Sequence, residues 1–148
     1  LRVDGGLGVD TLKLDATASA VSLDFTAGGL GGKIYGFESI DITGGGDNTL
    51  KLTLQDVLHQ PNVIDTSATT YNEAHLMVIS GNAGDVVQMS STASASPGSW
   101  TNAGTLSDTN KTALANIGYH FVNGDSYTVY TNGLATLVVD DAVTYRVI

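Results

Sequence analysis

Hydrophobic and polar residues alternate along several segments of the chain, which is the pattern of half-buried β-strands. Three hydrophobic residues alternate with polar ones over residues 20–26, and three leucines do so over residues 48–54. Further strands are predicted over residues 11–15, 33–42, 74–79 and 85–89. The alternation stops at residues 55–60, which predict one helical turn ended by Pro61, and residues 112–116 predict a short helix.

The last third of the chain contains the clearest hairpin signals. Asn123-Gly124 and Asn132-Gly133 separate alternating segments. Asn-Gly is favoured there because both central residues of a type I′ turn need positive φ. The segments are residues 119–122, 126–131, 134–140 and 143–148. We therefore predict a C-terminal antiparallel β-meander.

One short motif near the start of the chain carries chemical information. Residues 5–13, Gly-Gly-Leu-Gly-Val-Asp-Thr-Leu-Lys, fit the nonapeptide pattern GGxGxDxUx at every fixed position. In tandem arrays of this motif the glycines allow tight turns, and the aspartate and backbone carbonyls supply hard oxygen ligands to Ca²⁺. One turn offers only half of the coordination shell. A single copy therefore needs a neighbour to complete an ion site.

A degraded second copy follows the first. Thr11-Leu12-Lys13-Leu14 recurs as Thr49-Leu50-Lys51-Leu52, 38 residues later, and a glycine cluster with an acidic residue precedes each stretch. Two interpretations remain open. Either the chain repeats a turn-then-strand unit, or two glycine-rich turns before strands resemble each other by chance.

These patterns predict an all-β fold, with residues 1–148 forming a single domain. The architecture that we expect is an antiparallel β-sandwich with glycine-rich turns and a C-terminal β-meander. The rival is a parallel β-roll. Its stacked turns need several nonapeptides, and only one intact copy is present.

Composition narrows the class of protein. Charged residues make up only 14% of the chain, well below the roughly 25% of ordinary domains, and the net charge is −9. Such a balance disfavours nucleic acid and anionic membranes as partners, and no run of 18 apolar residues predicts membrane insertion. The absence of cysteine suits a cytosolic protein or a bacterial exoprotein. We expect a monomeric module that belongs to a longer polypeptide.

Several strings in a fixed order resemble a module of large bacterial RTX adhesins. They are residues 33–44 (KIYGFESIDITG), 48–52, 56–58, 81–87, 127–130 and 135–140. The resemblance implies type I secretion, a place at the bacterial cell surface and folding in external calcium. Its partners would be neighbouring modules of the same adhesin, which this module would position without catalysing a reaction.

Four residues are candidate calcium ligands. Asp4 and Asp10 lie in the nonapeptide region, and Asp47 and Asn48 lie in the second glycine turn. The competing interpretation is that Asp and Asn occupy such turns because they form Asx hydrogen bonds and tolerate the left-handed region. That interpretation is the stronger one for the second turn.

The single tryptophan supports an alternative function. Trp100 lies in residues 90–118, the part of the chain with the weakest pattern. An exposed Trp in a long polar loop can stack on a sugar or contact a peptide, so a host glycan or peptide is an alternative partner. A Trp that closes the end of the core is the competing interpretation.

No motif predicts an enzyme. The three histidines, His59, His75 and His120, are scattered, and neither the HExxH nor the GxSxG pattern is present. We therefore expect a non-catalytic protein.

Overall fold

Parallel strand pairing dominates the fold. The computed structural model describes residues 2–15, 17, 19–26, 30, 32–58, 63, 65–90 and 100–148. Its larger sheet has six strands in the order β2-β5-β7-β11-β10-β9, and a second sheet has four in the order β12-β8-β6-β3. The larger sheet comprises β2 (Thr11–Lys13), β5 (Ser39–Asp41), β7 (Leu76–Ser80), β11 (Ala135–Asp140), β10 (Tyr127–Asn132) and β9 (Thr101–Thr105). The smaller sheet comprises β3 (Ser22–Asp24), β6 (Thr49–Leu52), β8 (Val86–Met89) and β12 (Thr144–Val147).

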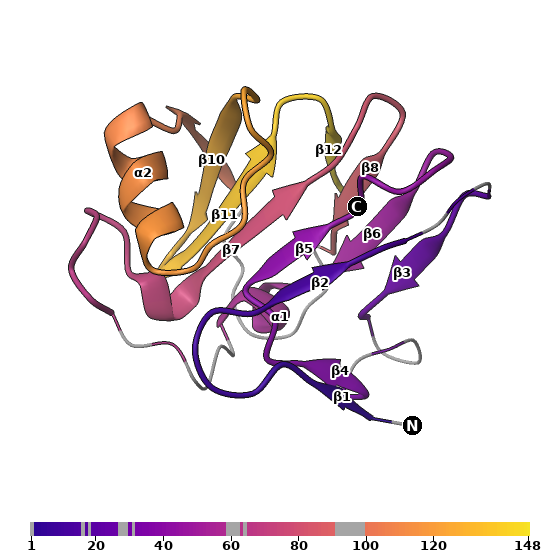
Figure 1. Ribbon diagram of the computed structural model, residues 1–148, viewed down its shortest axis with the longest axis horizontal. Coiled ribbons are helices and arrows are strands. Elements are labelled where there is room, and N and C mark those ends of the chain that lie inside the picture. Colours follow the sequence, from indigo (N-terminus) through magenta and orange to yellow (C-terminus); the bar gives the residue numbers. More distant parts are fainter. Residues whose placement is uncertain are drawn as a thin grey trace.

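The chain passes back and forth between the two sheets and forms four stacked coils (Figure 1). Each coil contributes one strand to each sheet: β2 and β3, then β5 and β6, then β7 and β8, and finally β11 and β12. Every neighbouring pair in these two series is parallel. The arrangement is a short β-solenoid, in which each coil buries its apolar residues against the next.

Aliphatic residues at matching positions of successive coils fill the space between the sheets. In the larger sheet the register aligns Leu12, Ile40, Ile79 and Val139. In the smaller sheet it aligns Leu23, Leu50, Val87 and Tyr145. Most of these side chains are fully buried and belong to one hydrophobic core. The alternation seen in the sequence therefore does mark the inward face of the strands.

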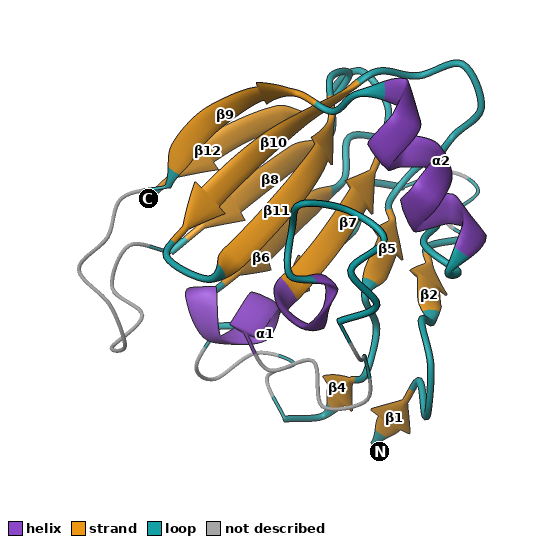
Figure 2. Ribbon diagram, turned by 90° about the vertical axis from the view of Figure 1, so that its left-hand side faces the viewer, coloured by secondary structure: helices purple, strands orange, loops and turns teal. Residues whose placement is uncertain are grey.

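The two central strands of the larger sheet are covered on both faces. Every residue of β7 and of β11 is buried. A second core lies on the outer face of this sheet, where helix α2 (Asp108–Asn116) and residues 117–122 cover it (Figure 2). Leu114 of α2 and Tyr119 are buried in this second core.

Smaller elements complete the solenoid. Strands β10 and β9 extend the larger sheet beyond β11 in antiparallel pairing. Helix α1 (Leu54–Leu58) places Leu54 and Val57 in the main core. A 3-10 turn (Glu73–His75) leads into β7, and β1 (Val3–Asp4) pairs with β4 (Ile34–Tyr35) beside the first coils.

The predicted antiparallel β-sandwich is wrong. The sheets lie face to face, but their strands are mainly parallel, and two α-helices are present. The predicted meander is correct only for the hairpin of β10 and β11. Its two-residue turn is Gly133-Leu134 and not the predicted Asn132-Gly133, because Asn132 ends β10 and pairs with Ala135, and of these turn residues only Gly133 has a positive φ. Residues 119–122 form no strand, and β12 leaves the hairpin to join the other sheet beside β8.

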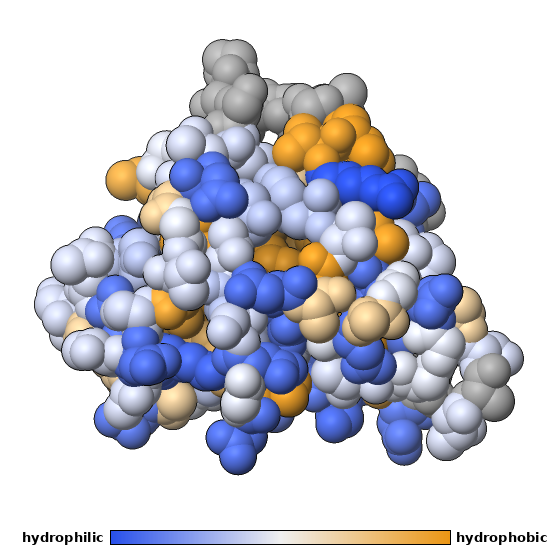
Figure 3. Space-filling model, turned by 90° about the horizontal axis from the view of Figure 1, so that it is seen from above, coloured by the Kyte–Doolittle hydropathy of each residue, from blue (hydrophilic) through white to orange (hydrophobic). Residues whose placement is uncertain are grey.

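The surface is mostly polar. The face seen from above is dominated by hydrophilic residues, with small and separate hydrophobic areas (Figure 3). Among the described residues, five large hydrophobic side chains are exposed: Val3, Leu7, Leu134, Val147 and Ile148.

Candidate functional site

The nonapeptide turn passes closely over the segment that precedes β5. A Cβ atom on Gly5 would lie 1.8 Å from the carbonyl oxygen of Gly36, so only glycine fits here. The preceding residue, Asp4, is exposed and accepts a hydrogen bond of 3.1 Å from the N–H of Gly6 through its Oδ1. The turn is therefore fixed against the second coil before β2 begins.

Asp10 and Glu38 lie side by side at the start of two neighbouring parallel strands. Thr11 pairs with Ser39, so the residues just before them, Asp10 and Glu38, occupy equivalent positions in coils 1 and 2. The N–H of Asp10 donates to Glu38 Oε2 at 2.8 Å. In return, the N–H groups of Glu38 and Ser39 donate to the carbonyl oxygen of Asp10 at 3.2 and 3.1 Å.

Each of these two carboxylates keeps one buried oxygen without a hydrogen bond within the described residues. These atoms are Oδ2 of Asp10 and Oε1 of Glu38. The Glu38 side chain is 0% exposed. Burial, supplemented by the charge of Asp10, raises the pKa of Glu38, although two backbone N–H groups oppose the shift. A buried pair of like charges needs a proton or a cation to become stable.

The charge of Glu38 also acts on Tyr119. Burial raises the pKa of the Tyr119 hydroxyl, and the nearby carboxylates of Glu38 and Glu73 raise it further. The hydroxyl donates to the carbonyl oxygens of Glu73 and Leu76 and therefore stays protonated.

The chemistry of this pair suits a hard divalent cation. Calcium prefers carboxylate and carbonyl oxygens, and both are present in the turn. No group of three or more His, Asp or Glu side chains is arranged to hold a metal in the parts of the chain that the structure describes. Any ion here would need backbone carbonyls and water to complete its shell.

The other predicted ligands lie at the opposite end of the strands. Asp47 and Asn48 follow β5, whereas Asp10 precedes β2, and these two strands run parallel. Asn48 is buried, and its Nδ2 donates to the carbonyls of Ile42, Gly44 and Gly46. Its Oδ1 accepts from the N–H of Val21 at 2.9 Å. The side chain of Asn48 thus has a full set of structural hydrogen bonds, while Asp47 is exposed.

Trp100 lies against the main core and is half-buried. Part of the predicted long loop, residues 91–99, falls outside the described residues. The remainder is more regular than its sequence indicates, because it contains β9 and α2. The short helix predicted at residues 112–116 is confirmed and begins four residues earlier, after the N-cap residue Ser107.

The sequence does not reveal that polar residues form a row on the outer face of the larger sheet. Asp41, Ser80 and Asp140 occupy adjacent strands at their carboxyl ends. The segment after α2 contacts this row: Nε2 of His120 lies 3.1 Å from Oδ2 of Asp41. The Tyr127 hydroxyl shares a hydrogen bond of 2.7 Å with Ser80 Oγ, and burial raises its pKa to about 12. These contacts attach residues 117–127 to the sheet.

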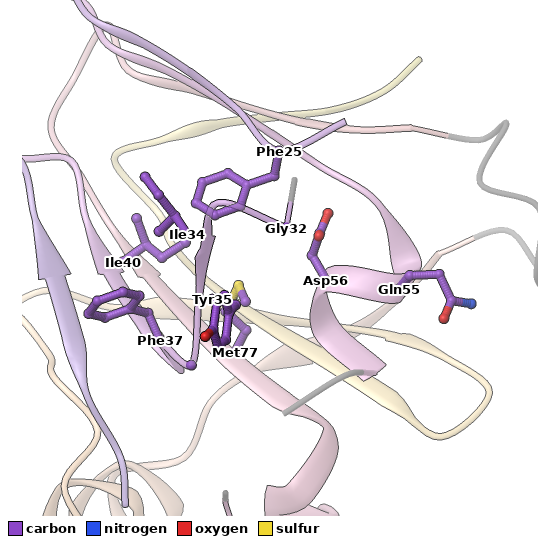
Figure 4. Close-up of a pocket in the computed structure, with 10 residues that line it drawn as sticks. Phe25, Gly32, Ile34, Tyr35, Phe37, Ile40, Gln55, Asp56 and Met77 are labelled. Carbon is purple, nitrogen blue, oxygen red and sulfur yellow. The ribbon is translucent and has the colours of Figure 1, made fainter. Parts of the chain in front are cut away.

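A cavity of about 220 Å³ opens beside α1 and β4 (Figure 4). Phe25, Ile34 and Ile40 gather on one side of it, and the side chain of Gln55 points away. Among the described lining residues only Tyr35 and Asp56 carry ionisable groups. Asp56 accepts hydrogen bonds from both the N–H and the hydroxyl of Thr53, the residue that precedes α1. The cavity therefore resembles an end of the core more than a reaction site.

Among the described residues, no helix is long and apolar enough to cross a membrane. Comparisons with protein-family models, with curated proteins and with solved structures found no match to this chain.

Proposed function

We propose that the chain is a non-catalytic, calcium-stabilised structural module of a secreted bacterial RTX adhesin. Its role is to position neighbouring modules at the cell surface. The observation that carries the proposal is the four-coil solenoid whose first strand, β2, is entered directly from the nonapeptide turn. In a solenoid each coil packs on the one before it, so the stack grows along one axis. Such a stack can hold the modules at its two ends in a fixed orientation.

The composition and the edges of the sheets also support this role. Strands β2 and β3 of the first coil are both edge strands, and so is β12 of the last coil. Edge strands offer unpaired backbone groups with which a further coil can pair. A chain with 14% charged residues and no cysteine suits a bacterial exoprotein that is stabilised by its core and by calcium.

The alternative is an adhesive module that binds a glycan or peptide through residues 90–118. The half-buried position of Trp100 against the core favours a packing role for this side chain. A Trp100→Ala variant that loses binding on a glycan array or on host cells would favour the adhesive alternative.

The proposed function is tested by unfolding the isolated module with and without calcium. A module that melts at a higher temperature in millimolar CaCl₂ than in EDTA, and that binds neither glycans nor cells, is the expected result. An unchanged melting temperature contradicts the calcium part, and direct binding to glycans or cells contradicts the purely structural role.

A further inference from the structure

We propose that Glu38 is a ligand of the same calcium ion as Asp10, so that the second coil completes the ion site of the lone nonapeptide turn. This inference rests on the proposed function, because it assumes that calcium stabilises the module. It goes further by naming the ligand pair, which excludes Asp4, Asp47 and Asn48 as principal ligands.

Strand register brings the two carboxylates together. Asp10 and Glu38 are 28 residues apart in sequence, yet they precede paired residues of adjacent parallel strands. Three hydrogen bonds fix their relative position: the N–H of Asp10 donates to the side-chain Oε2 of Glu38, and two backbone N–H groups donate to the Asp10 carbonyl. Like charges in adjacent register positions repel each other, so this arrangement is unfavourable unless something neutralises it.

The carboxylate oxygens without a hydrogen-bond partner indicate that the pair binds a cation. Oδ2 of Asp10 and Oε1 of Glu38 are both buried and accept no hydrogen bond from the described residues. Two carboxylates supply the charge that balances one divalent cation. Because the donors are oxygens only, with no thiolate or imidazole in the pair, the site suits calcium better than zinc.

The glycine turn supplies further oxygen ligands beside the two carboxylates. Gly5 approaches the carbonyl of Gly36 too closely to carry a side chain, which holds the glycine turn next to the residues that precede Glu38. Backbone carbonyls of such a turn are ordinary calcium ligands. In a tandem array a neighbouring nonapeptide would supply the second carboxylate, and in this module Glu38 takes that place.

The experiment is a calcium titration of the full chain by calorimetry and thermal unfolding. Wild type, Asp10→Asn and Glu38→Gln are compared with two matched controls. Asp4→Asn alters an acid beside the same turn. Asp140→Asn alters another buried carboxylate, on a different strand, whose Oδ2 also accepts no hydrogen bond from the described residues. Far-UV circular dichroism in EDTA establishes that each variant is folded.

We expect wild type and both controls to bind calcium and to gain about 8 °C in melting temperature at 100 times the Kd. Asp10→Asn and Glu38→Gln should lose at least 100-fold in affinity and most of this shift. Unchanged calcium binding by Glu38→Gln overturns the inference while leaving the proposed function intact. A wild-type chain without any calcium response overturns both the inference and the calcium part of that function.

A shared proton is the competing way to neutralise the pair. It would make the wild-type melting temperature depend on pH and not on calcium, and that result overturns the inference. If loss of calcium binding follows Asp4→Asn and not Glu38→Gln, the ion lies in the glycine turn alone, which also overturns it.

Discussion

Asp85 Oδ1 accepts a hydrogen bond of 2.7 Å from the backbone N–H of Asn48, and these residues occupy the same corner of successive coils. Asn48 in turn accepts from the N–H of Val21, one coil earlier. The side chain at each corner thus satisfies a backbone donor of the preceding coil. Such a ladder fixes the stacking of coils where the chain changes sheet, because buried N–H groups need acceptors.

Asp85→Ala should therefore destabilise the solenoid strongly. The carboxylate is fully buried and accepts from the N–H groups of both Asn48 and Asn82, so its removal leaves two donors without a partner. We expect a loss of about 3 kcal/mol in the free energy of unfolding, measured by urea titration. Asp47→Ala, at an exposed neighbouring position, should change it by less than about 0.5 kcal/mol. Equal effects of the two substitutions would refute the ladder.

Two tyrosines allow a matched test of the outer face. The Tyr127 hydroxyl contacts Ser80 and accepts a hydrogen bond of 2.8 Å from the N–H of Val122. Tyr127→Phe should cost about 1.5 kcal/mol in the free energy of unfolding. The buried hydroxyl of Tyr145 has no hydrogen-bond partner among the described residues, so Tyr145→Phe should cost nothing or should stabilise. If urea unfolding shows a larger loss for Tyr145→Phe than for Tyr127→Phe, the Tyr127 hydroxyl does not hold residues 117–127 against the larger sheet.

The strands and the last hairpin were predictable from sequence because alternation and Asn-Gly turns are local signals. The alternating segments at 20–26 and 48–54 contain β3 and β6. The predicted hairpin forms between β10 and β11, although its turn lies at Gly133-Leu134, one residue later than expected. The interruption at residues 55–60 marks α1, which begins at Leu54. These elements depend on neighbours in the chain and not on the sheet that each strand joins.

Parallel pairing was missed because its signals are indirect. The stretches 76–79 and 137–139 are continuously hydrophobic, which is typical of strands that are covered on both faces, as in parallel sheets. The apparent repeat of residues 11–14 at residues 49–52 is a chance likeness, because β2 and β6 occupy different sheets. The true equivalents of β2 and β3 are β5 and β6, with offsets of 28 and 27 residues. A single intact nonapeptide argues against a parallel β-roll, but the coils of this solenoid stack through turns of other sequence.

The candidate ion site was half predictable. Asp10 was identified from the nonapeptide, but Glu38 belongs to no glycine turn. A signal for it exists: Asp10-Thr11-Leu12-Lys13 and Glu38-Ser39-Ile40-Asp41 share the order acid, hydroxyl, aliphatic, charged. This likeness has meaning only once the two stretches are known to be adjacent parallel strands.

Gly5→Ala should disturb both the turn and the ion site. Its Cβ would lie 1.8 Å from the Gly36 carbonyl oxygen, so the backbone of one segment must shift. We expect a loss of about 2 to 3 kcal/mol in the free energy of unfolding together with weaker calcium binding. Gly133→Ala is the control: it meets open space at φ 59°, and strain in the left-handed region should cost only about 1 kcal/mol. An intact calcium response in Gly5→Ala would show that the turn does not shape the site.

Glu38 should make the calcium-free protein more stable in mild acid than at neutral pH. Its pKa is raised in the folded state, so folding favours the protonated form. Burying the ionised Glu38 carboxylate therefore costs nothing below the pKa that Glu38 has in the unfolded chain. The cost grows as the pH rises towards the pKa of Glu38 in the folded protein, and it is fully present above that value. In EDTA, the melting temperature of wild type relative to Glu38→Gln should rise as pH falls through this window. In saturating calcium the trend should reverse, because protonation then competes with the ion. Identical pH profiles for the two proteins under both conditions would show that Glu38 neither binds the proton nor the ion in the folded state.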